Sequence, residues 1–85
     1  MNFYVYIVEC SDGTYYCGYA KDLNSRIEEH NGSKTGARYT KSRRPVKLVY
    51  SEEFQSKSQA MKREAEIKKL SRRRKEALVL GQRSD

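Results

Sequence analysis

Aromatic and β-branched residues dominate the start of the chain on both sides of a turn sequence. Residues 3–10 are rich in aromatic and β-branched residues, residues 14–19 contain three tyrosines, and Ser-Asp-Gly at residues 11–13 separates the two runs. Such residues favour strands, and an Asp-Gly pair between two apolar runs favours a tight turn. The pattern therefore predicts a β-hairpin.

The length of the hairpin loop decides which side chains share a sheet face. One alternative is a three-residue loop that closes with Gly13 in the left-handed conformation. Tyr6 then pairs with Gly18 and lies on the same face as Tyr16. The other alternative is a two-residue loop, in which Tyr6 and Tyr16 face opposite sides of the sheet. Both registers are compatible with the sequence.

A helix is predicted directly after the hairpin. Asp22 is a favourable N-cap for this helix. Leu23, Ile27 and His30 follow at helical spacing, and the Asn-Gly pair at residues 31–32 is a stop signal.

The rest of the chain contains a basic segment, a third strand and two helices. Residues 33–44 lack a periodic apolar pattern and predict a loop, whereas the apolar residues at 46–50 predict a short strand. Ser56, with Gln59 three residues later, resembles a capping box at the start of a second helix. Ser71 is a favourable cap for a shorter final helix.

The predicted element order is β-β-α-β-α-α. A hairpin that precedes the helices indicates an α+β domain, with a small three-stranded mixed or antiparallel sheet flanked by helices. The 85 residues are too few to divide into two stable cores. We therefore expect one domain over residues 1–85, with a core at about residues 3–80 and a frayed tail at 81–85.

Positive charge exceeds negative charge by a wide margin. The 18 lysines and arginines against 11 acids give a net charge of +7. Such a surplus on a small surface favours a polyanionic partner, of which nucleic acid is the first class to consider. The longest apolar run, residues 3–8, is far shorter than the roughly 20 residues that cross a bilayer. We expect a soluble cytoplasmic protein with no membrane partner.

Histidine and cysteine are too few for several common sites. His30, Cys10 and Cys17 are the only residues of these types. Together they cannot complete a four-ligand zinc site or a set of disulfides. We expect both cysteines to be reduced and buried in strands. The sequence also lacks glycine-rich phosphate-binding motifs and a convincing Ser-His-Asp set.

Glu64 interrupts the apolar stripe of the second predicted helix. At 100° per residue it falls among the apolar positions, which are Ala60, Met61 and Ile67. Burial of an ionised carboxylate is costly unless a cation or strong donors meet it. Two roles stay open for Glu64, an internal salt bridge to an arginine and a metal ligand.

Four further residues are candidates for chemistry. Arg26 and His30 are four residues apart on the first predicted helix, so they stack on one face and can reach the sheet edge together. A solvated arginine and a helix-terminal histidine favoured by the helix dipole are the structural alternatives. Tyr6 and Tyr16 are equally ambiguous, because several of the seven tyrosines serve only to build strands.

The cations form two groups that suit contact with a phosphate backbone. The first lies in and just after the acid-free loop and comprises Lys34, Arg38, Lys41, Arg43, Arg44 and Lys47. The interleaved Tyr39 adds a ring for stacking, so we predict a nucleic-acid surface there. The second group lies on the last two helices and comprises Lys62, Arg63, Lys68, Lys69, Arg72, Arg73, Arg74 and Lys75. The alternative for either group is an ordinary solvated face.

The order and spacing of these residues resemble the GIY-YIG nuclease superfamily, in particular its short stand-alone bacterial members. Tyr-Val-Tyr at residues 4–6 stands for the first signature element, and Tyr-Cys-Gly at residues 16–18 stands for the second. Arg26 and His30 follow on the first predicted helix, and Glu64 follows on a later one. The resemblance covers nearly the whole chain.

The resemblance implies hydrolysis of DNA phosphodiesters with one divalent ion, Mg²⁺ or Mn²⁺, and RNA is the alternative substrate. Glu64 would hold the metal, which would polarise the phosphate. Arg26 would neutralise developing charge on the phosphate. Tyr6 corresponds to the tyrosine proposed to activate water, with His30 and Tyr16 as its supporting shell. We expect these residues to converge with Glu64 on one concave face.

Two positions depart from the family pattern. Tyr19 stands where many members carry lysine, and Glu76 stands where several carry asparagine. A rival hypothesis is therefore a non-catalytic DNA- or RNA-binding module on the same fold, and a third is an interaction protein for another nucleic-acid enzyme. Many members also carry a separate DNA-binding domain, and we expect none within these 85 residues. We expect a protein partner, a homodimer or DNA shape to supply specificity.

Overall fold

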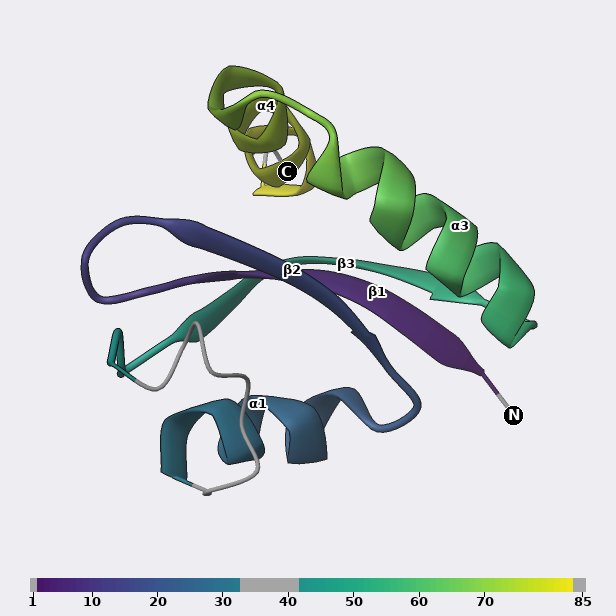
Figure 1. Ribbon diagram of the computed structural model, residues 1–85, viewed down its shortest axis with the longest axis horizontal. Helices are drawn as coiled ribbons and strands as arrows, with labels where there is room; N and C mark the ends of the chain where they lie inside the picture. Colours follow the sequence, from purple (N-terminus) through teal and green to yellow (C-terminus); the bar gives the residue numbers. More distant parts are fainter. Residues whose placement is uncertain (1, 33–41, 84–85) are drawn as a thin grey trace.

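A three-stranded sheet with helices on both of its faces makes up the part of the chain that the structure describes (Figure 1). The structure is a computed structural model, which describes residues 2–32 and 42–83. Its elements are β1 (Phe3–Glu9), β2 (Tyr15–Ala20), α1 (Leu23–Gly32), β3 (Lys47–Phe54), α3 (Lys57–Lys68) and α4 (Arg72–Arg83). The predicted α+β class is confirmed.

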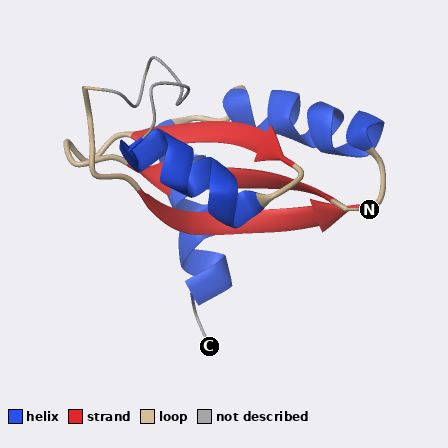
Figure 2. Ribbon diagram, turned by 90° about the horizontal axis from the view of Figure 1, so that it is seen from below, coloured by secondary structure: helices blue, strands red, loops and turns tan. Residues whose placement is uncertain are grey.

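The sheet is antiparallel throughout, with β1 in the centre and the order β2-β1-β3. The helix α1 covers one face, and α3 and α4 cover the other (Figures 1 and 2). The strand β3 is longer than predicted and continues through polar residues to Phe54. Backbone pairing with the central strand explains this extension, since Tyr6 pairs with Ser51 and Tyr4 with Glu53.

The hairpin closes as a three-residue loop. Gly13 has a φ of 84°, the left-handed conformation that favours glycine. The Cys10 N–H donates to the Thr14 carbonyl at 2.8 Å. The resulting register places Tyr6 and Tyr16 on the same sheet face, which resolves the two alternatives left open by the sequence.

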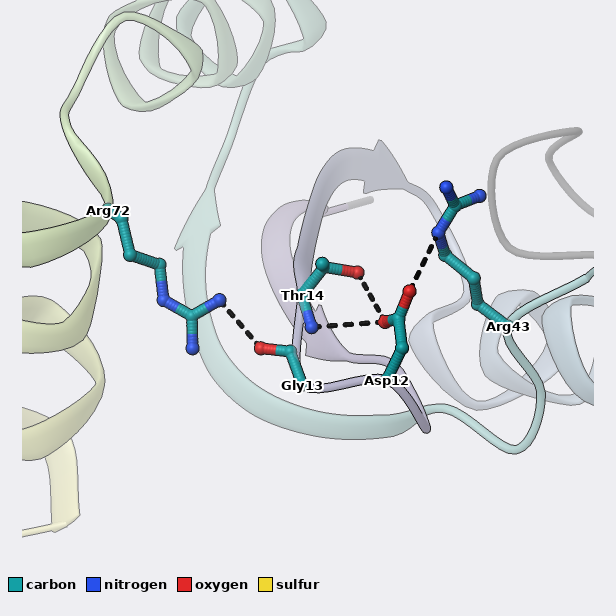
Figure 3. Close-up of polar contacts among 5 residues, drawn as sticks. All are labelled: Asp12, Gly13, Thr14, Arg43 and Arg72. Atoms are coloured by element: carbon teal, nitrogen blue, oxygen red, sulfur yellow. Dashed lines mark hydrogen bonds and ion pairs between the residues drawn. The ribbon is translucent and has the colours of Figure 1, made fainter.

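Two arginines from later in the chain hold this loop (Figure 3). Arg43 forms an ion pair with Asp12 at 3.0 Å. Arg72 donates to the Gly13 carbonyl at 2.6 Å, and its guanidinium lies 3.8 Å from the centre of the Tyr15 ring. The hairpin tip is therefore tied both to the segment before β3 and to α4.

The two sheet faces bury separate apolar clusters, because successive residues of a strand point to opposite sides. The cluster toward α3 and α4 comprises Val5, Ile7, Cys17, Val49, Tyr50, Ala60, Ile67 and Val79. The cluster toward α1 comprises Tyr6, Val8, Cys10 and Val46, with Leu23 and Ile27 packed against it. Both cysteines are free and buried, as predicted.

All three predicted helix caps are present. Asp22, Ser56 and Ser71 each accept a hydrogen bond from the backbone N–H three residues later, at 3.0, 3.2 and 3.3 Å. The helix α4 continues to Arg83, whereas we expected fraying from Gly81. Among the described residues, every helix is too short or too polar to cross a membrane.

Candidate functional site

Tyr6, Tyr16 and His30 meet between the sheet and α1. Tyr6 comes from β1, Tyr16 from β2 and His30 from the last turn of α1. The Tyr6 hydroxyl lies 2.8 Å from His30 Nε2. The His30 ring makes edge-on contacts with the Tyr6 and Tyr16 rings, at centroid distances of 5.8 and 5.3 Å. These three side chains form one packed unit.

Burial keeps the Tyr6 and His30 side chains neutral. Tyr6 is 1% exposed and His30 is 0% exposed. Burial raises the pKa of Tyr6 to about 12, and the neighbouring Arg26 guanidinium only partly opposes this rise. Burial also lowers the pKa of His30, and Arg26 adds to that effect. At neutral pH the pair is therefore a phenol and a neutral imidazole.

Arg26 and Tyr16 are the members of this group that reach solvent. Arg26 lies one turn before His30 on α1, and its side chain is 28% exposed. It forms an ion pair with Glu29 at 3.4 Å. Tyr16 is half-buried. A ligand that approaches from solvent would therefore meet Arg26 and Tyr16 before the Tyr6–His30 pair.

Gly18 makes room for the Tyr6 hydroxyl. A Cβ atom at Gly18 would lie 2.5 Å from the Tyr6 oxygen and 2.8 Å from Cζ. Both distances are far below van der Waals contact, so any larger residue would displace the ring that reaches His30. From the sequence, Gly18 was recognisable only as part of a signature. Its pairing with Tyr6 in the three-residue register was the signal that could have revealed this role.

The end of α1 is clamped to the segment before β3. Asn31 Nδ2 donates to the Val46 carbonyl at 2.9 Å, and the Val46 N–H donates to Asn31 Oδ1 at 2.6 Å. Arg44 donates to the carbonyls of Glu29, at 3.2 Å, and of His30. The clamp fixes the helical turn that carries His30. Sequence reasoning missed it, because Asn31 was considered only as a stop signal.

Of the loop that we predict to bind nucleic acid, residues 33–44, the structure describes residues 42–44. Lys34, Arg38, Tyr39 and Lys41 lie outside the described residues. Arg43 pairs with Asp12 (Figure 3), and Arg44 holds the end of α1. Both arginines thus have intramolecular contacts, and their role in binding nucleic acid stays a prediction.

Glu64 lies on the other side of the sheet. Its helix, α3, covers the face opposite α1 (Figure 1), where the neighbouring stripe residues Ala60 and Ile67 are fully buried. The Glu64 side chain is 18% exposed and pairs with Lys68 Nζ at 3.4 Å. Glu64 lies beside the buried Ala60 and Ile67 as predicted, whereas Met61, the third predicted residue of the stripe, is 46% exposed. The partner of Glu64 is a lysine rather than an arginine.

The expected convergence of Glu64 with the tyrosines on one face is therefore wrong. Burial raises the pKa of the Cys17 thiol to about 11, and the charge of Glu64 contributes to this rise. Glu64 thus lies close to β2 on one face, while Tyr16 points to the other face of the same strand. Because β2 is an edge strand, a ligand shared by the two groups can reach from one face to the other around its outer edge.

Glu64 is suited to hold a divalent ion as its single carboxylate ligand. Among the described residues, no three or more His, Cys, Asp or Glu side chains gather into a potential metal site. Mg²⁺, however, is commonly held by one or two carboxylates and keeps several waters. The Glu64 carboxylate is partly exposed and already pairs with the ammonium group of Lys68. It therefore suits that kind of coordination.

Comparison with known proteins identifies similar chains. The GIY-YIG catalytic domain family matches residues 2–77. UPF0213 proteins of Staphylococcus aureus, including those of strains Mu3 and N315, are 58% identical over 76 residues, which cover 89% of this chain and 92% of the relative.

Two solution NMR structures are also similar. A UPF0213 protein from Bacillus halodurans has 53% identity and a TM-score of 0.60, with 93% of this chain and 83% of that chain covered. A protein from E. faecalis has 39% identity and a TM-score of 0.67, with 100% and 90% covered.

Proposed function

The chain belongs to the GIY-YIG catalytic domain family, and on that premise we propose that it is an endonuclease that hydrolyses DNA phosphodiesters with Mg²⁺ or Mn²⁺. The observation that carries the proposal is the packed group of Tyr6, His30 and Tyr16 with Arg26 beside it. The net charge of +7 supports a polyanionic substrate.

Arg26 and Tyr16 are the residues that we assign to the substrate. A guanidinium presents a planar fork of donors that matches a phosphate, and the Arg26 side chain is partly exposed. Its ion pair with Glu29 is long and near the surface, so a phosphate can replace Glu29 at low cost. We propose that Tyr16, which is half-buried, contacts the attacking water or a phosphate oxygen.

Tyr6 and His30 suit a positioning role. The resemblance to the family gives Tyr6 the task of activating water. With a pKa of about 12 the Tyr6 hydroxyl keeps its proton at neutral pH, and its 1% exposure keeps it away from solvent. The Tyr6–His30 hydrogen bond instead holds the imidazole ring against Tyr16. We propose that this contact orients Tyr16.

Glu64 is the residue that we propose to hold the divalent ion. When bound, the ion supplies Lewis-acid stabilisation of the phosphate and the leaving oxygen. In the structure, Lys68 neutralises the Glu64 carboxylate. A phosphate that meets both Glu64 and Arg26 would lie at the outer edge of β2, since the two residues come from opposite faces of the sheet.

Cleavage assays with the pure protein test the proposal. Supercoiled, branched and single-stranded DNA would be incubated with and without Mn²⁺, and cleavage is expected only with the metal. Glu64→Gln should abolish cleavage and leave DNA affinity equal or slightly higher, because one negative charge is removed. Glu66→Gln is the matched control, since this exposed glutamate of α3 pairs with Arg63. Unchanged cleavage by Glu64→Gln would remove Glu64 as the metal ligand.

A second candidate function is a DNA- or RNA-binding module without cleavage. The separation of Glu64 from the tyrosine group favours it, as do Tyr19 and Glu76 at the two departures from the family pattern. Tight binding without cleavage of any DNA or RNA substrate, with either metal, would support this function. In both cases we propose that a protein partner, a homodimer or DNA shape supplies specificity.

A further inference from the structure

The densest positive charge in the chain lies where α3 ends and α4 begins. Residues 68–75, which we call the α3–α4 corner, contain six lysines and arginines among eight residues and no acid. The corner lies on the sheet face opposite α1 (Figure 1). It is therefore separate from Arg44, which holds the end of α1 on the other face.

Two of these six cations are used within the fold. Lys68 pairs with Glu64 at 3.4 Å. Arg72 pairs with Glu76 at 3.0 Å and also binds the hairpin loop (Figure 3). The other four are Lys69, Arg73, Arg74 and Lys75, and within the described part of the chain none of them forms an ion pair.

Helix stability does not explain Arg73, Arg74 and Lys75, although Lys69 is the C-cap of α3, where the helix dipole favours a cation. The first turn of α4 contains only cations, although the positive end of the helix dipole favours acids there. Neighbouring like charges also repel one another. Lys69, Arg73 and Arg74 are exposed, so they contribute little to packing. The corner thus carries an unfavourable charge arrangement that an external anion would relieve.

The corner adjoins the residue proposed to bind metal. Lys68 contacts Glu64 directly. The charges of Glu64, Lys68 and Lys75 all act on the pKa of the Cys17 thiol in β2, with burial as the largest influence. Glu64, Lys68 and Lys75 therefore lie near the same strand.

We propose that Lys69, Arg73, Arg74 and Lys75 form a phosphate-binding surface that holds a nucleic-acid backbone on the Glu64 side of the sheet. The inference rests on the proposed function, because that proposal supplies the nucleic-acid ligand. It adds the place on the protein where the nucleic-acid backbone binds. The backbone would run across the α3–α4 corner toward the outer edge of β2. These contacts would position the nucleic acid without reading its bases.

Salt-dependent binding of duplex DNA tests the surface. Binding would be measured in EDTA, so that cleavage has no influence, with wild type, Arg73→Ala/Arg74→Ala and Lys57→Ala/Lys62→Ala. The second double variant is the matched control, because it removes the same charge from exposed positions of α3 away from the corner. Urea unfolding would verify that each variant is folded, and exposed substitutions of this kind change stability by less than about 0.5 kcal/mol.

The corner variant should lose two phosphate contacts. The slope of log K against log salt should become shallower by about 2, at roughly 0.9 per contact, whereas the control should change the slope by much less. Affinity should fall alike for unrelated DNA sequences.

Three outcomes would overturn the inference, and the third would also overturn the proposed function. Equal effects of both double variants would mean that net charge alone matters. Corner-dependent binding to anionic lipid vesicles without corner-dependent DNA binding would assign the corner to a membrane surface. Absence of DNA and RNA binding by the wild type would instead remove the proposed function itself, and with it the ligand of the corner.

Discussion

The two faces of the sheet carry opposite kinds of polar groups. On the α1 face, Tyr6 and His30 are buried, neutral and hydrogen-bonded to each other. On the α3 face, Glu64 is partly exposed and paired with Lys68, and the α3–α4 corner adds cations that lack ion pairs among the described residues. The first arrangement is complete within the protein, whereas the second carries charge that a ligand can balance.

This difference predicts different costs of substitution. A buried polar unit that is fully satisfied contributes to a unique packing, and its loss leaves unpaired groups in the interior. Exposed charges contribute little to stability but strongly affect the binding of charged ligands. Changes on the α1 face should therefore destabilise the protein, and changes on the α3 face should alter ligand binding.

The largest loss of stability is expected from Gly18→Ala. The new methyl group would lie within 3 Å of the Tyr6 ring, which is enclosed and cannot move into solvent. Overpacking of this kind costs about 1–3 kcal/mol, and we expect the upper part of that range. Urea unfolding followed by circular dichroism measures the loss.

Gly81→Ala is the matched control for this substitution. Among the described residues, a Cβ atom at Gly81 meets no atom within 4 Å outside the backbone of its own helix, α4. Alanine should therefore stabilise the protein by up to about 1 kcal/mol through its higher helix propensity. Equal behaviour of the two variants would show that Tyr6 does not depend on Gly18.

Acidification should weaken the α1 face through His30, the only histidine of the chain. Its folded-state pKa lies below the usual value of 6.5 because of burial, so the unfolded chain binds more protons just below that pH. The free energy of unfolding should therefore be highest above pH 6.5 and fall as the pH drops toward 5. Urea unfolding at several pH values measures this fall.

His30→Gln serves as the comparison for the pH series, since glutamine is polar but does not titrate. Its stability should be flat over the same pH window. Asp12 and Asp22 have lowered pKa values because of hydrogen bonds from Thr14 and Ser25, so their contribution is lost only at lower pH, near and below 3.8. A wild type that becomes more stable on acidification would mean that His30 is charged in the folded protein.

The smallest change in stability is expected on the α3 face. Lys68→Ala removes an exposed i,i+4 ion pair with Glu64, which is worth about 0.3–0.5 kcal/mol. The same substitution should tighten Mn²⁺ binding, because the Glu64 carboxylate loses its competing cation. Electron paramagnetic resonance of free Mn²⁺, without DNA, measures the affinity. Lys62→Ala should leave it unchanged, and a loss of affinity in Lys68→Ala would contradict the role of Glu64.

Local features of the fold were predictable from the sequence because they depend on spacing within one element. The Asp12-Gly13 turn and the helix caps involve residues at most a few positions apart. The place of Glu64 in an apolar stripe follows from the 100° turn of a helix. Whether Tyr6 and Tyr16 share a face depends on the length of the hairpin loop, for which the sequence left two alternatives open.

Only the tertiary structure decided the partners that are distant in sequence. Arg43 meets Asp12, and Arg44 meets the carbonyl of His30, through the path of the chain rather than through any local pattern. Charge alone made both arginines equally suitable for nucleic acid. The sequence therefore overestimated the number of cations without a role in the fold.

The face on which Glu64 lies was also decided by tertiary structure. The strand β1 is apolar on both sides, with Val5 and Ile7 toward α3 and with Tyr6 and Val8 toward α1. Either face could therefore have received either helix as far as hydrophobic burial is concerned. The choice depends on how the chain leaves β3 and on how each helix fits its cluster, and neither is encoded in the periodicity of a single element.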